Sequence, residues 1–427
     1  MRILLTSTAS YVPPRGGSTR SNLVWLEHLV SRGHECRVIC GAAEDHTEEH
    51  RSARREELQG QGLEGALRDE GGVEVAEYRG IGVFASASAS RRASLLRAHI
   101  DQFEPDWVLV SSEDISHTLL KQASTLAPGR IVYMAHTPQF FPFGSESWNP
   151  DEAATAAVQA SACVVTISQA VSAYVQSAMS VRVQVVHPPI YRKPPYRNVA
   201  HFGAGRVTMV NPCAVKGISI FLELAATMPD VSFAALPGWG TTSQDRAKLE
   251  AMPNVKLLAP VRRMETIFEQ SSVFLVPSLW MEGFGLIAME AMLSGIPVMS
   301  SDSGGLKEAK SGTGYVIPVQ PIASYKNEYD DRHMPVPNID SQSIEPWVEA
   351  LRHLLANERE YNAESARSFE RATRFVSKLD AGELEQVLLS LPAPDPKSSA
   401  ASAAAERVAR LSPEKRAMLL SKLRKLD

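Results

Sequence analysis

The sequence has few cysteines, and it lacks motifs that would define its chemistry directly. Only four of its 427 residues are cysteines, and none form a Cys-x-x-Cys pair, so we expect reduced core thiols and neither disulfides nor a metal site. They are Cys36, Cys40, Cys163 and Cys213. No Asp-x-Asp occurs, so the sequence gives no indication of a divalent ion bound through that motif. The first glycine loop, at residues 12–17, lacks Gly-x-Gly-x-x-Gly, which disfavours a nicotinamide-dependent oxidoreductase.

Excess positive charge and long apolar runs are also missing. The net charge of -4 gives no electrostatic reason to expect a nucleic-acid partner. No apolar run approaches the length of a membrane span, and a strand pattern begins directly at Arg2, so we expect no signal peptide and a soluble, cytoplasmic protein. A chain of 427 residues with 44% hydrophobic and 22% charged residues can bury two cores, which predicts two domains.

Short apolar, β-branched runs alternate with glycine loops and helical patterns in the first half of the chain. This order is typical of a doubly wound α/β domain, which we expect to span residues 1–190. A helix is predicted near residues 20–32, a solvated and partly helical excursion at 44–70, and a flexible stretch at 85–90. Buried strands are predicted at residues 2–6, 34–40, 106–111, 130–134, 163–168 and 183–186.

The second half repeats this pattern, and we expect a second domain of the same kind at residues 200–365. Helices are predicted at 343–356 and 358–391. Residues 392–427 are predicted to form a linker rich in Pro, Ala and Ser and a terminal amphipathic helix. Buried strands are predicted at residues 206–210, 231–236, 255–258, 273–277, 297–300 and 314–317.

Residues 278–295 bring two glutamates and a glycine turn together between a strand and a helix. Glu282 and Glu290 are separated by seven residues. The turn Gly283-Phe284-Gly285 lets the backbone approach a ligand closely, and its free amides favour an anion such as phosphate at the start of the helix. Glu290, in the first two turns of that helix, is placed to accept hydrogen bonds from the hydroxyls of a ribose. An ordinary strand-to-helix connection with two surface glutamates is the alternative interpretation.

Further polar candidates follow other predicted strands. Lys216 precedes a glycine at a helix start, where its point charge can meet a diphosphate. His136 follows the strand at 130–134, on the edge where open α/β sheets bind ligands. An aromatic run follows at residues 139–148. We expect it either to cover an apolar acceptor or to pack the edge of the domain.

The segment PSLWMEGFGLIAMEAMLSGIPVMSSDSGGLKEA, residues 277–309, resembles the signature of the family 4 retaining glycosyltransferases. That family has the GT-B fold, in which two Rossmann-like domains face each other across a cleft. The resemblance covers roughly residues 1–391 and implies that residues 366–391 return to the first domain. It also implies that Glu290 holds the ribose of a nucleoside diphosphate sugar and that Glu282 holds the hydroxyls of the transferred sugar. Backbone contacts to the donor are implied for Gly283, Phe284, Gly285 and Leu286.

The same resemblance implies roles for residues elsewhere in the chain. His136 is expected beside the transferred sugar, and Lys216 matches the lysine of the donor-binding loop. Gly16 and Gly17, in the first loop, are expected beside the donor phosphate and the acceptor.

One position departs from the family pattern. The family usually has arginine five residues before the lysine, where this sequence has Asn211. Because an amide cannot neutralise phosphate charge, the diphosphate is expected to depend more on Lys216, on helix dipoles or on another arginine. Arg262 and Arg263 are candidates for that arginine, although a solvated loop pair is the simpler interpretation of both.

These features and the resemblance together predict a glycosyltransferase that uses a nucleoside diphosphate sugar, of the UDP or GDP type, and needs no metal or other cofactor. Retention of the anomeric configuration is implied by the resemblance alone. LSPEKRAMLLSKLRK, residues 411–425, resembles short segments that border condensation domains of nonribosomal peptide synthetases. The expected acceptor is therefore a hydroxyl of a small-molecule or peptide natural product, of nonribosomal peptide or polyketide origin, with docking through the C-terminal helix. A lipid or cell-envelope saccharide acceptor remains an alternative. A non-catalytic nucleotide-binding or docking protein is a further alternative, in which Asn211 reflects the loss of catalytic activity.

Overall fold

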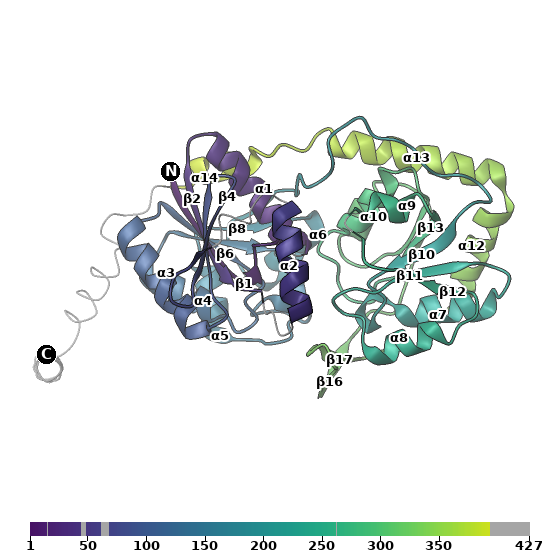
Figure 1. The fold of residues 1–427 in the computed structure, drawn as a ribbon, viewed down its shortest axis with the longest axis horizontal. Helices are drawn as coiled ribbons and strands as arrows, with labels where there is room; N and C mark the ends of the chain where they lie inside the picture. Colours follow the sequence, from purple (N-terminus) through teal and green to yellow (C-terminus); the bar gives the residue numbers. More distant parts are fainter. Residues whose placement is uncertain (15, 44–47, 61–67, 262, 393–427) are drawn as a thin grey trace, which may run out of the picture.

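The structure, a computed structural model, describes residues 1–14, 16–43, 48–60, 68–261 and 263–392. It confirms the predicted α/β architecture of two Rossmann-like domains, which lie side by side (Figure 1). The predicted linker and amphipathic helix at residues 393–427 lie outside the described residues. Among the described residues, no helix is long and apolar enough to cross a membrane.

Within the described residues, the first domain contains a nine-stranded sheet in the order β3-β4-β5-β2-β1-β6-β7-β8-β9. β1 (Arg2–Ser10) lies at its centre and pairs in parallel with β2 (Glu35–Gly41) and β6 (Trp107–Ser111). The other strands are β3 (Arg68–Asp69), β4 (Glu74–Tyr78), β5 (Ile81–Ala85), β7 (Ile131–Ala135), β8 (Cys163–Thr166) and β9 (Val183–Val185).

Helices pack on both faces of this sheet. Ile3 and Leu4 belong to different hydrophobic clusters, because successive side chains of a strand point to opposite faces. Leu26 of α1 joins the cluster of Ile3, and Leu96 of α3 joins the cluster of Leu4. The helices of this domain are α1 (Gly17–Ser31), α2 (Glu48–Gly60), α3 (Ala89–Phe103), α4 (Thr118–Leu126), η1 (Pro138–Phe140), α5 (Glu152–Gln159) and α6 (Gln169–Ala178).

Two features between residues 74 and 91 differ from the prediction. β4 and β5 form an antiparallel hairpin whose turn places Arg79 and Gly80 at positive φ, and no strand was predicted there. The flexible stretch predicted at 85–90 is wrong, because Ser88 is the N-cap of α3 and its hydroxyl accepts a hydrogen bond from the Arg91 amide. Alternating Ala and Ser resembles linker composition, yet serine is also a preferred N-cap.

In the described part of the chain, the second domain contains a six-stranded sheet in the order β12-β11-β10-β13-β14-β15, and its paired strands are parallel. Its strands are β10 (Arg206–Val210), β11 (Phe233–Leu236), β12 (Val255–Leu257), β13 (Ser271–Val276), β14 (Val298–Ser301) and β15 (Val316–Ile317). Its helices are η2 (Ala214–Lys216), α7 (Ile218–Thr227), α8 (Ser243–Glu250), α9 (Glu265–Phe268), α10 (Leu286–Met292), α11 (Leu306–Ala309) and α12 (Glu345–Ala356). An additional hairpin of β16 (Ser324–Tyr329) and β17 (Pro335–Asn338) was not predicted.

The chain returns to the first domain at its C-terminal end, but not as one helix. The helix predicted at 358–391 is instead α13 (Glu358–Val376), which lies over the second domain, and α14 (Glu383–Ser390), which lies over the first (Figure 1). Asp380 stabilises the intervening turn by accepting a hydrogen bond from the Gly382 amide (2.8 Å). Glu385 of α14 then contacts His34 of the first domain at 2.8 Å.

Candidate functional site

A cavity of about 570 Å³ lies between the two domains, and its walls come from both. This volume is within the range of small-molecule sites. Apart from the alternative arginines, Arg262 and Arg263, the residues that the sequence nominated for binding or catalysis border it: Gly16, Gly17, His136, Asn211, Lys216, Glu282, Gly283, Phe284, Gly285, Leu286 and Glu290. The fold therefore brings together candidates that are distant in sequence.

Glu282 and Lys216 form an ion pair in this cavity. Lys216 Nζ lies 2.6 Å from the Glu282 carboxylate, which also accepts a hydrogen bond from the Ser278 hydroxyl (2.5 Å). The same ammonium group lies 4.3 Å from the ring centroid of Trp280. Burial by itself raises the pKa of Glu282, but the charge of Lys216 and the hydrogen bonds outweigh burial, so the pKa lies below its usual value. Glu282 is thus held as a carboxylate.

The turn that carries Glu282 is fixed by a second glycine turn after β14. The Gly305 amide donates to the carbonyl oxygen of Glu282 at 2.8 Å. A Cβ atom at Gly304 would lie 2.3 Å from the same carbonyl oxygen, so this position needs glycine. These glycines therefore support the shape of the site and do not border the cavity.

Glycines also permit the close approach of the two domains. A Cβ atom at Gly283 would lie 2.2 Å from the His136 carbonyl oxygen, and one at Gly17 would lie 2.6 Å from Leu286 Cδ1. The Ser168 hydroxyl of the first domain donates to the Gly283 carbonyl at 2.6 Å. Among the described residues, none accepts a hydrogen bond from the amides of residues 283–285. These amides can therefore donate hydrogen bonds to a ligand. The helix that follows them, α10, is only seven residues long, so the turn amides are the main donors at this point.

Glu290 pairs with Arg20, a residue that sequence analysis did not nominate. Arg20 Nη2 of α1 lies 3.3 Å from the Glu290 carboxylate, so the pair joins the two domains. Burial raises the pKa of Glu290 above its usual value despite the opposing charge of Arg20. Both residues also border a second cavity of about 560 Å³.

The structure tests only one of the two arginines proposed to compensate for Asn211, and that arginine does not border the cavity of Lys216. Arg263 borders the second cavity, and Arg262 lies outside the described residues. Arg20 is the arginine that borders the cavity of Lys216 within the described residues. No local spacing could have indicated it, because its position depends on how α1 faces the second domain.

Asn211 itself shapes the loop at residues 237–240. It adopts a φ of 55°, and its side-chain oxygen accepts a hydrogen bond from the Gly240 amide at 2.8 Å. A Cβ atom at Gly238 would lie within 3 Å of the Asn211 side chain. The loop places Trp239 at the edge of the cavity, with its ring centroid 6.0 Å from that of Trp280.

His136 is buried at the other wall of the cavity. Its Nε2 lies 2.9 Å from Oδ1 of Asn22, and its ring stacks on Trp25 with centroids 6.0 Å apart. Burial lowers the pKa of His136, against the opposing charge of Glu113, so the ring is neutral near pH 7. Sequence analysis missed both Asn22 and Trp25, since both lie on the helical face of α1 that a periodicity argument assigns to the core.

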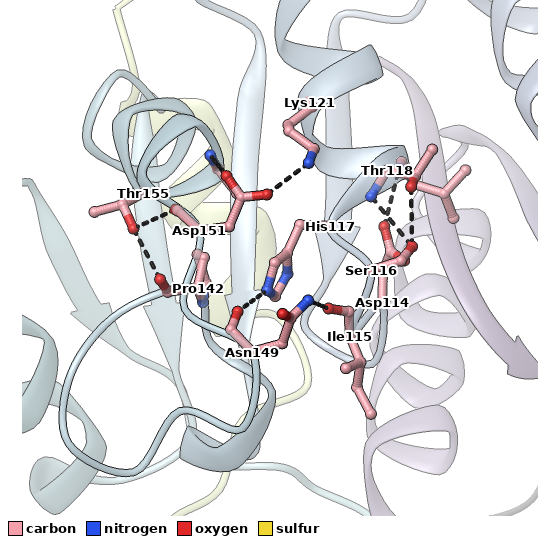
Figure 2. A network of polar contacts seen from close by, with 12 residues as sticks. Asp114, Ile115, Ser116, His117, Thr118, Lys121, Pro142, Asn149, Asp151 and Thr155 are labelled. Carbon is pink, nitrogen blue, oxygen red and sulfur yellow. Dashed lines mark hydrogen bonds and ion pairs between the residues drawn. The ribbon is translucent and has the colours of Figure 1, made fainter. Parts of the chain in front are cut away.

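The aromatic segment at residues 139–148 packs the edge of the first domain. Figure 2 shows polar contacts at Pro142 of this segment and at Asn149, which follows it. The Thr155 hydroxyl donates to the Pro142 carbonyl oxygen at 2.9 Å, and the His117 ring donates to the Asn149 carbonyl oxygen at 2.9 Å. Phe141 is completely buried, whereas Phe140 borders the cavity. The segment therefore serves mainly as packing and contributes one aromatic ring to the cavity wall.

Two family models match the chain, one in each domain. The model described as Glycosyltransferase Family 4 matches residues 15–192, and the model described as Glycosyl transferases group 1 matches residues 204–328. Taken together with the fold, these matches mean that the chain belongs to the GT-B glycosyltransferases.

Individual relatives are distant. D-inositol 3-phosphate glycosyltransferase of Corynebacterium urealyticum is 27% identical over 42% of this chain and 41% of its own length. The chain spans less than half the length of the curated relatives it matches. Sucrose-phosphate synthase of Thermosynechococcus elongatus has a TM-score of 0.64 at 14% identity, over 91% of this chain and 99% of its own. Anabaena HepE, in complex with UDP and glucose, has a TM-score of 0.61 at 16% identity, over 92% of this chain and 100% of its own. At such identities these structures establish the fold alone.

Proposed function

We propose that this chain transfers a sugar from a nucleoside diphosphate sugar to a hydroxyl of an acceptor, with retention of the anomeric configuration and without a metal ion. One observation carries the proposal. Lys216, Glu282 and Glu290 of the second domain and His136 of the first converge on one cavity between the domains. Such a cavity can hold both substrates away from water.

The phosphate side of the reaction is assigned to cationic and amide groups. Lys216 and Arg20 supply positive charge at the cavity, and the amides of residues 283–285 have no acceptor in the part of the chain that the structure describes. When the bond between the sugar carbon and the diphosphate breaks, negative charge develops on the leaving oxygen. Preorganised donors stabilise that charge without reorganisation, which lowers the barrier. Glu290 is assigned to the ribose hydroxyls. When the donor binds, its carboxylate leaves Arg20 and accepts hydrogen bonds from these hydroxyls.

The sugar side is assigned to Glu282 and His136. Glu282 is an ionised carboxylate that can orient sugar hydroxyls and stabilise the positive charge of an oxocarbenium-like centre. The acceptor oxygen bonds to that centre from the face that the diphosphate leaves, and its proton passes to the departing diphosphate oxygen. Retention is supported by the likeness to family 4. The proton route follows from retention, because the acceptor then approaches on the face where the departing diphosphate oxygens lie.

For the acceptor we propose a hydroxyl of a peptide or polyketide natural product. The support is the sequence at residues 411–425, which lies outside the described residues. Incubating the active enzyme with candidate acceptors and measuring a mass increase of one glycosyl unit tests this assignment. A product formed only with an envelope saccharide would contradict it.

Donor turnover tests the proposed function itself. The full chain is incubated in EDTA with UDP-, GDP-, ADP- and dTDP-sugars, and free nucleoside diphosphate is measured. UDP-sugars come first because the HepE structure contains UDP. We expect release from one class of donor, its loss in Glu290→Ala and its retention in Glu250→Ala, an exposed glutamate of the same domain. If no donor releases nucleoside diphosphate and no nucleotide binds, the result favours a non-catalytic docking protein.

A further inference from the structure

A buried chain of hydrogen bonds leads from Glu113 to His136 inside the first domain. Glu113 accepts a hydrogen bond from the hydroxyl of Ser111, at the end of β6. Ser111 Oγ lies 2.9 Å from Nδ2 of Asn22 on α1, and Asn22 Oδ1 lies 2.9 Å from Nε2 of His136. Ser111, Asn22 and His136 are each at most 3% exposed, so water does not compete for these bonds.

The chemistry of the groups fixes the direction of every bond in this chain. A carboxylate can only accept, so Ser111 must donate its one hydroxyl hydrogen to Glu113. The Ser111 oxygen can then only accept from its remaining partner, which must be the NH₂ group of Asn22. The same NH₂ group donates to the Tyr11 hydroxyl at 2.7 Å. The amide orientation of Asn22 is therefore determined by its surroundings and not by its contact with His136.

The Asn22 oxygen consequently faces the imidazole ring of His136. Since that oxygen only accepts, Nε2 must carry the proton, and Nδ1 of the neutral ring keeps its lone pair. Nδ1 is buried and has no hydrogen-bond partner among the described residues, and His136 is one of the residues that border the cavity. A group that approaches Nδ1 must therefore be a hydrogen-bond donor.

We propose that Glu113, Ser111 and Asn22 are positioning residues that hold His136 in the Nε2–H tautomer, so that its Nδ1 accepts a hydrogen bond from a hydroxyl of the transferred sugar. The tautomer assignment stands on the hydrogen bonds alone, whereas the sugar hydroxyl rests on the proposed function. The substrate class that follows is a donor sugar with a free hydroxyl at the position nearest His136. A deoxy sugar at that position leaves the buried Nδ1 unpaired.

The tautomer can be measured directly in the full chain. Protein labelled with ¹⁵N-histidine is studied by long-range ¹H–¹⁵N NMR near pH 7.5, and the His136 signals are assigned by their loss in His136→Gln. We expect the pattern of a neutral ring protonated at Nε2. Glu113→Gln and Ser111→Ala remove the directional constraint, so in both the His136 signals should shift toward the other tautomer. Glu77→Gln, at an exposed site of the same domain, should leave them unchanged.

Two variants keep the test decisive if one of them fails to fold, and circular dichroism melting identifies such a failure. A wild-type ring protonated at Nδ1 would overturn the proposal. So would His136 signals that stay at their wild-type positions in the folded variants.

The sugar hydroxyl is tested with deoxy analogues of whichever donor is turned over. One analogue should lose about tenfold in kcat/KM with the wild type, the size of a lost hydrogen bond. This discrimination should shrink in Ser111→Ala, a result that a merely structural role for Ser111 does not produce. If His136 is protonated at Nε2 but no donor is turned over, the tautomer assignment stands and the proposed function is wrong. If a donor is turned over but His136 is not held in the Nε2–H tautomer, the proposed function stands and the tautomer assignment is wrong.

Discussion

Lys216 Nζ lies 2.6 Å from the carboxylate of Glu282, so the cation assigned to the diphosphate is paired with the carboxylate assigned to the sugar. A donor must compete with this pair for Lys216. Once Lys216 turns to the phosphates, Glu282 loses its nearest opposite charge while positive charge develops on the sugar. The pair therefore links donor binding to the electrostatics of the reacting centre.

Replacing the lysine should weaken nucleotide binding. In Lys216→Met, the nucleoside diphosphate loses a charge-assisted contact, and we expect its dissociation constant to rise by about tenfold or more. Calorimetric titration with the active nucleotide measures the change. Lys256→Met removes an exposed lysine of the same sheet and is the control. Equal affinities in the two variants would contradict the role of Lys216.

Arg20 is expected to supply the positive charge that Asn211 cannot. Arg20→Gln removes a cation from the cavity and leaves Glu290 without its partner at 3.3 Å. We expect kcat/KM for the donor to fall by about tenfold to a hundredfold, because charged hydrogen bonds are worth about 1.5–3 kcal/mol. The matched control is Arg97→Gln on the exposed face of α3. A fall of the same size in both variants would show that Arg20 has no special role.

Gly283 should be essential for the closed arrangement of the domains. In Gly283→Ala, the new methyl group would lie 2.2 Å from the His136 carbonyl oxygen, so the two domains must separate. We expect a folded protein that loses most donor turnover and has a larger radius of gyration in small-angle scattering. Gly60→Ala, where a Cβ atom meets nothing within 4 Å, should leave both properties unchanged. Full activity in Gly283→Ala would refute this account of the interface.

The pH dependence of activity should report the neutral state of His136. Burial depresses its pKa below 6.5 in the folded protein, so the ring stays neutral as the pH falls through 6.5. Between the two pKa values the unfolded state binds more protons at His136 than the folded state does. The stability that the neutral ring contributes above pH 6.5 is therefore lost as the pH falls toward the folded pKa. We expect the acid limb of kcat/KM below pH 6.5.

Asn22→Asp provides the contrasting case for this pH dependence. It places a carboxylate near Nε2 of His136, at the position of an oxygen that is 2.9 Å away. An adjacent negative charge raises the pKa of a histidine, so the acid limb should move to higher pH. Identical limbs in the wild type and the variant would contradict the assignment of this limb to His136.

Much of the fold was predictable, because buried parallel strands leave a local signature. The run at residues 206–210 became β10 with the predicted bounds, and the run at 273–277 became β13, shifted by one or two residues. The break between α13 and α14 was missed, since the apolar pattern continues through it and the turn is set by Asp380 and Gly382. The β4–β5 hairpin was missed because glutamates interrupt the apolar residues of β4 and a glycine interrupts those of β5, so neither strand forms a continuous apolar run.

The candidate site was predictable only where the residues follow a strand or a glycine turn. Glu282, Glu290, Lys216 and His136 were found in this way, but their pairings were not. Glu282 and Lys216 are 66 positions apart, and Arg20 is 270 positions from Glu290. The first contact depends on the tertiary packing of the second domain, and the second depends on the packing of the two domains against each other. No local sequence pattern encodes either.

The most direct test of the account is the rate of nucleoside diphosphate release by Glu282→Gln, measured with the preferred donor in EDTA. This substitution keeps the shape of the side chain and removes the charge that Lys216 contacts. We predict a rate at least a hundredfold below that of the wild type, with nucleotide affinity retained, because the lost charge acts on the reacting sugar. A variant as fast as the wild type would contradict the central claim that Glu282 acts on the transferred sugar.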